Sequence, residues 1–385
     1  MISDSPTFCP APWTSLNIDK TGEVTPCMHC YTPQGNIKKK TIQEVIHGPK
    51  LESIRQHMIE GKWHDACSWC KRLEETTGVS GRTVRYASKE TIAAINADPK
   101  WFSLEHLVVN WSNLCNLTCS YCNAETSTAW QSALKIPINH DRNEHQDLIE
   151  LAKTSGHSLE GLTLGGGEPL LQKGLAEFLK YLDANKVNVL VTTNLSVDLQ
   201  NNAIYQELKN WPRVSWMISF DNANQQKFEY VRYGASWDKF VENIRIMKQD
   251  NQRVAAHPAY SIYCAWDLME YYDFCKSMDL TLYWCELNYP QELDIRRMPE
   301  PVRMRAIQEI DRILEKYADQ REMSLDILEK YKLTLTDNSY LAPMDRNLFV
   351  TDWHRKQEQQ INKTLKFENL WPELAELLQE VPDVK

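Results

Sequence analysis

The sequence predicts an α/β protein built around a partial (β/α)6 TIM-type barrel, with a small N-terminal cysteine-rich α+β domain and a helical C-terminal extension. From about residue 104, apolar strand-like runs alternate with amphipathic helical stretches, which is typical of parallel strands joined by crossover helices. The first 90 residues instead form short elements interrupted by Pro, Gly and Cys, and mainly helical patterns follow residue 290. We therefore expect three segments, 1–90, 104–290 and 291–385.

The composition is that of a globular chain long enough for two or three domains. Of its 385 residues, 42% are hydrophobic and 25% are charged, so neither disorder nor a coiled coil is expected. The net charge of -9 argues against a nucleic-acid-binding face. Met1 to Trp13 has no basic stretch followed by an apolar run, and no segment approaches 18 apolar residues. We expect a cytoplasmic protein with no signal peptide, no membrane contact and no nucleic-acid partner.

Eleven cysteines are the unusual feature of the composition, and eight of them lie in the first 122 residues. An odd number argues against a complete set of disulfides. In a reducing compartment, clustered thiols more often bind metal or carry out redox chemistry. The cysteines therefore predict metal or redox sites in the first third of the chain.

Elements of the predicted fold follow from periodicity and turn signals. In the N-terminal segment we expect strands at Ser15–Ile18 and Glu23–Thr25 around a turn at Gly22, and one or two helices within Thr41–Glu60. Six later runs are predicted as barrel strands: Leu107–Asn110, Gly161–Leu164, Val187–Thr192, Val214–Phe220, Ala259–Tyr263 and Leu280–Glu286. Helices are predicted at Leu148–Thr154, Gly174–Ala184, Trp237–Gln249, Asp267–Met278, Pro301–Tyr317 and Glu373–Gln379. Six repeats fall short of a closed eight-stranded barrel.

A C-x3-C-x2-C motif, made by Cys115, Cys119 and Cys122, directly follows the first predicted barrel strand. Three thiolates on one loop can hold three irons of a cubane cluster, which leaves the fourth iron free to bind a small molecule. A zinc site with a distant fourth ligand, or cysteines without a metal role, are the alternatives. The motif stands where the carboxyl ends of barrel strands carry chemistry, which favours the cluster.

A run of three glycines, a glutamate and a proline, Gly165–Pro169, follows the second predicted barrel strand. Glycines let the backbone approach a ligand closely, and the carboxylate of Glu168 can accept hydrogen bonds from an ammonium group. An ordinary strand-to-helix turn is the alternative. Three of only thirteen glycines fall here consecutively, which favours a ligand-binding turn.

These motifs resemble the signature of the radical S-adenosylmethionine (radical SAM) superfamily, over about residues 104–290. The resemblance implies a 4Fe-4S cluster on the three motif cysteines, whose open iron binds S-adenosylmethionine and cleaves it reductively to a 5'-deoxyadenosyl radical. It implies that Tyr121 lies near the adenine and that Gly166, Gly167 and Glu168 contact the methionine amino group. It also implies that polar residues after the third and fourth strands surround the ribose and carboxylate, and that an arginine pairs with the methionine carboxylate. These are Asn194, Ser219, Asp221 and Arg232.

A second cysteine group precedes the barrel: Cys9, Cys27, Cys67 and Cys70. A structural zinc ribbon is the simplest interpretation of four such thiols. The pattern also resembles the auxiliary-cluster domain called SPASM, or its shorter form twitch, which implies one auxiliary 4Fe-4S cluster on these four residues. Two features depart from that domain, because it usually follows the barrel and because Cys30 is an additional thiol that either replaces Cys27 or has no ligand role. If all four ligands come from the protein, an electron acceptor or relay is expected rather than a substrate site.

Other residues carry weaker predictions. Cys285, near the end of the last predicted strand, is a candidate hydrogen-atom donor to a substrate radical, as a cysteine is in some radical peptide epimerases. A buried cysteine acting as a small hydrophobe is the simpler alternative for it, and for Cys264 and Cys275. His140 and His145 lie in a polar stretch that is expected to be a solvated loop rather than a metal site.

The expected function is therefore that of a radical SAM enzyme reduced by a flavodoxin or ferredoxin, which abstracts hydrogen from a substrate C–H. Resemblance implies modification of a ribosomally made peptide by oxidation, crosslinking or epimerisation. A small-molecule dehydrogenase or rearrangement enzyme is the close alternative, since no separate leader-peptide-binding domain is evident. The alternative from a different class is a non-enzymatic scaffold in which both cysteine groups hold structural zinc.

Overall fold

The computed structural model describes residues 2–137, 146–287, 289–320, 322–337 and 346–379. The chain divides into two compact units. Unit 1 comprises residues 1–114, 139–191 and 200–214, and unit 2 comprises residues 115–138, 192–199 and 215–385. These units are interleaved along the sequence, and the three expected segments remain a prediction.

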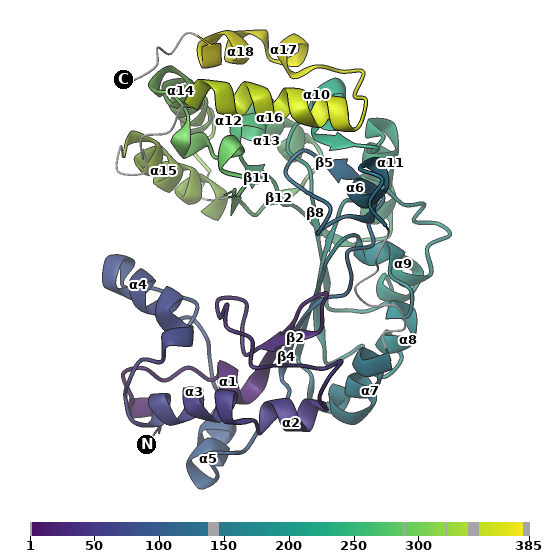
Figure 1. Ribbon diagram of the computed structural model, residues 1–385. Helices are drawn as coiled ribbons and strands as arrows, with labels where there is room; N and C mark the ends of the chain where they lie inside the picture. Colours follow the sequence, from purple (N-terminus) through teal and green to yellow (C-terminus); the bar gives the residue numbers. More distant parts are fainter. Residues whose placement is uncertain (1, 138–145, 288, 321, 338–345, 380–385) are drawn as a thin grey trace. The chain divides into compact units, whose positions relative to one another are not determined.

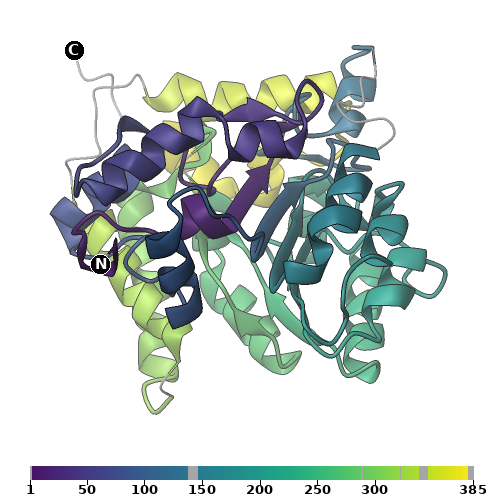
Figure 2. The same ribbon diagram turned by 90° about the horizontal axis from the view of Figure 1, so that it is seen from below.

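The N-terminal hairpin of unit 1 is joined to the first barrel strand. Strand β1 (Ser15–Ile18) pairs antiparallel with β2 (Glu23–Thr25), which pairs with β3 (Gly35–Asn36). On its other side β1 runs parallel to β4 (His106–Asn110), with Leu16 opposite Leu107 and Ile18 opposite Val109. Figure 2 shows β1, in purple, beside β4. The cysteine-rich segment therefore extends the barrel sheet through β1, even though it precedes the barrel in the chain.

Unit 1 continues the parallel sheet with β6 (Gly161–Gly165) beside β4 and β7 (Asn188–Thr193) beside β6. In each strand alternate residues are buried, and the others are half-buried apart from His106 and Asn188, which are exposed. The buried positions are apolar except Thr193, and each apolar one contributes about 1.5–3 kcal/mol to folding. The helices of unit 1 are α1 (Ala11–Thr14), α2 (Ile42–Ile46), α3 (Pro49–Ile59), α4 (Ser68–Thr77), α5 (Lys89–Ala97), α7 (Gln146–Ser155), α8 (Leu175–Leu179) and α9 (Ala203–Leu208).

Unit 2 holds the remaining barrel strands, with β10 (Arg253–Ala256) parallel to both β8 (Val214–Ile218) and β12 (Thr281–Leu282). Two small pairs complete its strands, β5 (Thr118–Cys119) with β9 (Arg232–Tyr233), and β11 (Ala259–Tyr260) with β13 (Cys285–Glu286). The helices here are α6 (Thr128–Ala133), α10 (Gln225–Val231), α11 (Trp237–Gln249), α12 (Ile262–Ala265) and α13 (Leu268–Ser277). Six barrel strands are present as predicted, and the α/β fold with a largely parallel sheet is confirmed.

Three predicted elements differ from the structure. The fifth strand is β10 rather than Ala259–Tyr263, because Pro258, which has no N–H to donate, separates β10 from β11, and Ile262 begins α12. The predicted strand Leu280–Glu286 is split into β12 and β13. The helix predicted over Gly174–Ala184 ends at Leu179, and the chain then turns where Asp183 accepts a hydrogen bond from the Asn185 N–H (2.9 Å).

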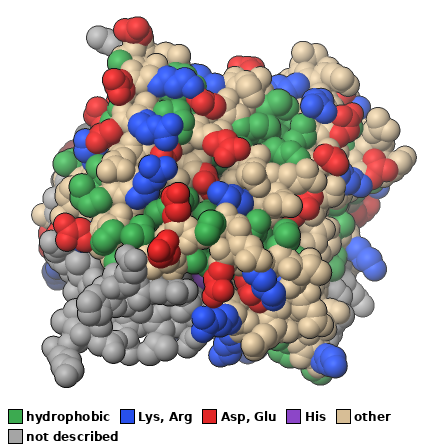
Figure 3. Space-filling view, turned by 90° about the horizontal axis from the view of Figure 1, so that it is seen from above, with side chains coloured by type: hydrophobic (Ala, Val, Ile, Leu, Met, Phe, Trp, Pro, Cys, Tyr) green, Lys and Arg blue, Asp and Glu red, His purple; other side chains and the backbone are tan. Residues whose placement is uncertain are grey.

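The C-terminal extension is helical, as predicted, and comprises α14 (Glu300–Lys316), α15 (Met323–Thr336), α16 (Arg346–Gln360), α17 (Phe367–Leu370) and α18 (Pro372–Gln379). Helix α14 packs against α13, α15 and α18, and α16 packs against α18 (Figure 1). On the face shown in Figure 3, acidic and basic side chains are interspersed. Among the described residues, no helix combines the length and apolar character needed to cross a membrane.

Candidate functional site

The loop that carries Cys115, Cys119 and Cys122 is fixed by its backbone in unit 2. Strand β5 places Cys119 opposite Arg232 of β9, and the N–H of Ser120 donates to the carbonyl oxygen of Val231 (2.7 Å). The N–H of Cys115 donates to Thr128 Oγ1 (3.2 Å), at the start of α6. The loop is therefore held from two sides before any cofactor binds.

Cys122 interacts with both of the other thiols of this loop. Hydrogen bonding with Cys122, and then burial, raises the pKa of Cys119. The same hydrogen bond lowers the pKa of Cys122, while burial and then the charge of Cys115 act against that lowering. In the described ranges, no three or more His, Cys, Asp or Glu side chains are arranged to hold a single metal ion. A 4Fe-4S cluster spreads its thiolates over several irons, and three neighbouring thiols on one loop fit such a group.

A buried ion pair adjoins the thiol loop and connects three predicted cofactor residues. Asp221 Oδ2 accepts hydrogen bonds from the Tyr121 hydroxyl (2.9 Å) and from Arg232 Nε (3.0 Å), and its Oδ1 accepts one from the Ala259 N–H (2.8 Å). The side chains of Asp221 and Arg232 are 0% and 6% exposed. Burial opposes the charge of Arg232, but the carboxylate of Asp221 outweighs it and raises the pKa of the guanidinium. The structure therefore brings Tyr121, Asp221 and Arg232 together.

Two further predicted residues lie at the carboxyl ends of β7 and β8. Asn194 Nδ2 lies 3.7 Å from Cys115 Sγ and 3.3 Å from Asn116 Oδ1, and its Oδ1 accepts from the Ser196 hydroxyl (2.6 Å). The N–H of Ser219 donates to the carbonyl oxygen of Thr193 (2.8 Å). Asn194 thus contacts a motif cysteine, whereas Ser219 is placed by its backbone.

The glycine-rich turn lies in unit 1, against the residues that lead into the thiol loop. The N–H of Gly167 donates to the Ser112 carbonyl oxygen (2.7 Å), and the N–H of Glu168 donates to the Leu114 carbonyl oxygen (2.8 Å). Gly166 has a φ of +114°, and a Cβ there would lie 2.7 Å from the Ser112 oxygen. The buried Glu168 carboxylate accepts from the Leu170 N–H (3.0 Å). The glycines therefore allow a close backbone approach to Ser112–Leu114, which directly precede Cys115.

The second cysteine group also converges, in unit 1. Cys67 occupies the N-cap position of α4 without a side-chain capping hydrogen bond, and Cys70 lies in the first turn of the helix. Burial raises the pKa of Cys67 to about 12, and the charges of four further thiols, Cys30, Cys27, Cys9 and Cys70, act in the same direction. Burial raises the pKa of Cys9 to about 11, while the Ala11 N–H and the charge of Arg85 favour its thiolate. Four of these five thiols, all but Cys70, belong to or pack against the apolar core around Trp13, and the five together provide a donor set that fits an iron-sulfur cluster.

Cys27 and Cys30 have different surroundings. Cys27 accepts hydrogen bonds from the N–H groups of His29 and Cys30. Cys30 instead donates its thiol hydrogen to the Thr32 carbonyl oxygen (3.5 Å) and lies 3.9 Å from Gln34 Nε2. Cys27 stays the predicted ligand, and a ligand role for Cys30 stays the alternative.

Changing Cys27 to Ala is expected to remove the auxiliary cluster, which is about half of the bound iron if two cubanes are present. Changing Cys30 to Ala is the matched control, because it removes a thiol from the same turn, and the iron content should stay near that of the unchanged protein. Iron and sulfide analysis of anaerobically purified variants measures both. Loss of iron in the Cys30 variant alone would reverse the assignment.

Arginines hold the cysteine segment in place. Arg82 forms an ion pair with Glu74 of α4, and its Nη1 donates to the Phe8 carbonyl oxygen (3.0 Å), next to Cys9. Arg85 Nη1 donates to Ser15 Oγ (3.2 Å).

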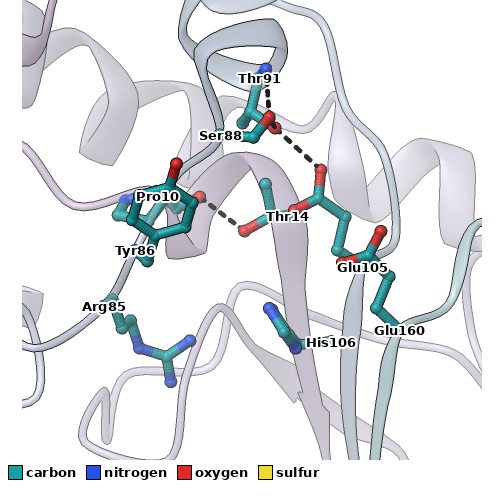
Figure 4. Close-up of a pocket in the computed structure, with 9 residues that line it drawn as sticks. All are labelled: Pro10, Thr14, Arg85, Tyr86, Ser88, Thr91, Glu105, His106 and Glu160. Carbon is teal, nitrogen blue, oxygen red and sulfur yellow. Dashed lines mark hydrogen bonds between the residues drawn. The ribbon is translucent and has the colours of Figure 1, made fainter. Parts of the chain in front are cut away.

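The Arg85 side chain also lines a cavity of about 450 Å³ in unit 1. Figure 4 shows Arg85 and His106 extending into this cavity from opposite sides. The cavity lies at the amino ends of β1, β4 and β6, opposite the edge that carries the glycine-rich turn.

The weaker candidates have different outcomes. Cys264 and Cys275 are 0% exposed, so the interpretation as buried hydrophobic residues holds for them. Cys285 is exposed, so that interpretation does not hold for Cys285. Although the residue as a whole is exposed, enclosure of its thiol raises the pKa of Cys285, and the charge of Asp221 adds to this. A hydrogen-donor role for Cys285 stays a prediction. His140 and His145 lie outside the described residues.

One group of residues at the thiol loop was missed by sequence reasoning. Ser120, between two predicted site residues, is fully buried and contacts Gln357 and Lys363 of the C-terminal extension. No local pattern in the sequence marks a surface-type residue such as Lys363 as buried, because its burial depends on packing between distant segments. The extension therefore adds contacts to the candidate site that the sequence did not indicate.

Comparison with known proteins agrees with these two sites. The family model of the radical SAM superfamily matches residues 109–264, and that of SPASM, described as an iron-sulfur cluster-binding domain, matches residues 9–71. A GTP 3',8-cyclase of Peptoclostridium acidaminophilum is 28% identical over 144 residues, which are 37% of this chain and 42% of the relative. A 7-carboxy-7-deazaguanine synthase of Clostridium acetobutylicum is 30% identical over 115 residues, 30% of this chain and 47% of the relative. The match thus spans less than half of the length of these relatives.

The structure comparison also found solved structures with partial similarity. One is described as "Native anSMEcpe with bound AdoMet"; its sequence is 16% identical, the TM-score is 0.43, and the match covers 57% of this chain and 62% of that chain. Another is Streptococcus suis SuiB bound to precursor peptide SuiA, at 14% identity and a TM-score of 0.42, covering 78% of this chain and 69% of that one. The two family matches coincide with the two convergent thiol groups. The chain belongs to the radical SAM superfamily of enzymes, which pair a 4Fe-4S cluster with S-adenosylmethionine, and it carries a SPASM iron-sulfur cluster-binding domain before the radical SAM region.

Proposed function

We propose that this chain cleaves S-adenosylmethionine reductively at a cluster held by Cys115, Cys119 and Cys122, and uses the resulting radical to abstract hydrogen from a substrate C–H. The observation that carries the proposal is the convergence of three motif thiols beside the Tyr121–Asp221–Arg232 network. When bound, the cluster and S-adenosylmethionine supply the electron transfer and the 5'-deoxyadenosyl radical.

The protein's own residues bind and orient the cofactor. Asn194 Nδ2, close to Cys115 Sγ, places an amide donor at the edge of the thiol group. Tyr121 is fixed by Asp221 and lies under the guanidinium of Arg232, whose Cζ is 5.4 Å from the ring centroid, so its orientation is set before an adenine arrives. By resemblance, the methionine amino group is assigned to Gly166, Gly167 and Glu168, where the carboxylate of Glu168 can accept hydrogen bonds from an ammonium group.

A peptide is the proposed substrate class, and a small molecule is the second candidate. Exposed apolar side chains lie in the segment that carries the auxiliary thiols, and Tyr31 packs edge-on against Trp69, which stacks on His29. This apolar set comprises Met28, Tyr31, Trp69, Val84 and Tyr86. Such surfaces are typical of protein or peptide contacts. The small-molecule candidate is favoured by partial similarity to GTP 3',8-cyclases.

One auxiliary cluster is proposed, on Cys9, Cys27, Cys67 and Cys70, as an electron acceptor or relay. If all four ligands come from the protein, no iron of this cluster is left open for a substrate, which favours a role in electron transfer. A flavodoxin or ferredoxin is the proposed donor.

The test is anaerobic reconstitution followed by reduction with S-adenosylmethionine present. Two cubanes predict roughly eight irons per chain, a brown protein and formation of 5'-deoxyadenosine. A peptide substrate should increase that formation and a nucleotide should not. If Cys285 is the hydrogen donor, product made in D2O carries deuterium at the modified carbon, and the Cys285→Ala variant does not yield it. A colourless zinc protein without cleavage would instead support the scaffold alternative.

A further inference from the structure

The C-terminal extension contacts the thiol loop through a buried lysine. Lys363 follows α16 and is 3% exposed. Its Nζ donates to Ser120 Oγ (3.0 Å) and to the Tyr230 carbonyl oxygen (2.9 Å), and Gln357 Nε2 donates to the Ser120 carbonyl oxygen (2.7 Å). Ser120 lies between Cys119 and Tyr121. The ammonium group is therefore fixed one residue away from a proposed cluster ligand.

The contact is built rigidly. Glu358 Oε1 accepts from the Tyr230 hydroxyl (3.0 Å) and from the Phe367 N–H (2.8 Å). The His354 ring stacks on Phe367 at 3.8 Å between centroids, and its Nε2 shares a hydrogen bond with the Tyr263 hydroxyl (2.8 Å). The hydrogen bond to Glu358 fixes Tyr230, whose carbonyl oxygen accepts from Lys363.

The position is electrostatically unusual. Both oxygens that Lys363 contacts are uncharged, and its Nζ lies 4.1 Å from the centroid of the Tyr230 ring. Burial lowers the pKa of Lys363 to about 7, and the negative charge of Cys119 and then that of Glu358 oppose this. Burying a cation costs free energy unless a nearby negative charge compensates it. The thiolate loop is the first such charge, and a bound cluster would add to it.

We propose that Lys363 is a positioning residue that also tunes the catalytic cluster: its buried ammonium holds the Ser120 turn and favours the reduced, more negatively charged state. This inference rests on the proposed ligands Cys115, Cys119 and Cys122. Reduction adds one electron from an external low-potential donor. The net charge around a cluster is one of the factors that set its potential, and a fixed positive charge in a low-dielectric site raises it.

The test is an EPR-monitored redox titration of the anaerobic holoenzyme. The catalytic cluster is identified as the signal that changes when S-adenosylmethionine is added. Lys363→Gln keeps a hydrogen-bond donor but removes the charge, and it should lower the equilibrium constant for reduction about tenfold, or about 59 mV. Lys363→Arg keeps the charge and should stay near the unchanged protein. The matched control is Lys356→Gln, which removes an exposed lysine of α16 and should shift the constant less than twofold.

A fully iron-loaded Lys363→Gln variant with an unchanged constant would overturn the proposal. If that variant does not retain iron, Lys363→Met decides the question, because it fills a similar space without a charge and should lower the constant to a similar extent, and no change there would overturn the proposal. Failure of the ligand assignment looks different. In that case a variant with all three motif cysteines changed to Ala keeps the signal that responds to S-adenosylmethionine.

Discussion

Changing Cys115, Cys119 and Cys122 together to Ala is expected to remove about half of the bound iron and all reductive cleavage of S-adenosylmethionine. The three thiols share one loop, and Cys119 and Cys115 both influence the pKa of Cys122. The cysteines near Cys67 form a separate group, so their cluster should survive. Iron analysis, the visible absorption spectrum and chromatography of 5'-deoxyadenosine measure the outcome.

The matched control is Cys275→Ala. Cys275 is a buried free thiol of α13, outside both groups, and its removal should leave iron content and cleavage unchanged apart from a small loss of stability. Iron content unaffected by the triple change would reject the ligand assignment. Loss of all iron would mean that the two sites depend on each other, contrary to the separate groups described above.

The barrel strands were predictable because their burial alternates along the chain. In β4 and β6 the buried Leu107, Val109, Leu162 and Leu164 alternate with half-buried residues, which gives a period that a single sequence displays. The motif cysteines and the glycine-rich turn were also recognisable, because spacing within a loop is a local property. An apolar run alone does not distinguish a long strand from a short one. The run after Pro258 resembles a barrel strand in sequence, but only its first two residues form β11, and α12 begins at Ile262.

Contacts between distant segments were not predictable. The parallel pairing of β1 with β4 joins residues about 90 positions apart. The short elements of the N-terminal segment, interrupted by Pro, Gly and Cys, had suggested a separate domain. Lys363 contacts Ser120 across 243 positions. Helical periodicity could predict the C-terminal helices but not what they contact, since a lysine is recognisable as buried only once its surroundings are known.

Changing Asp221 to Asn is expected to cost about 3–5 kcal/mol of unfolding free energy, because it leaves the guanidinium of Arg232 buried without its countercharge. It also weakens the acceptor that fixes the Tyr121 hydroxyl, so binding of S-adenosylmethionine should weaken as well. Anaerobic urea denaturation of the iron-loaded protein and equilibrium dialysis with S-adenosylmethionine measure the two effects. A variant as stable as the unchanged protein would show that another group compensates the charge of Arg232 when Asp221 is absent.

The double variant Asp221→Asn/Arg232→Met separates folding from cofactor binding. Replacing a buried ion pair by groups of similar size is often close to neutral for stability, so the double variant should recover most of the loss. It should not recover binding of S-adenosylmethionine, since the residue assigned to the methionine carboxylate is then absent. If the double variant regains both stability and binding, Asp221 and Arg232 serve only the fold. Recovery of stability alone supports their assignment to the cofactor site, where the same ion pair holds Tyr121 and the β5–β9 strands that carry Cys119.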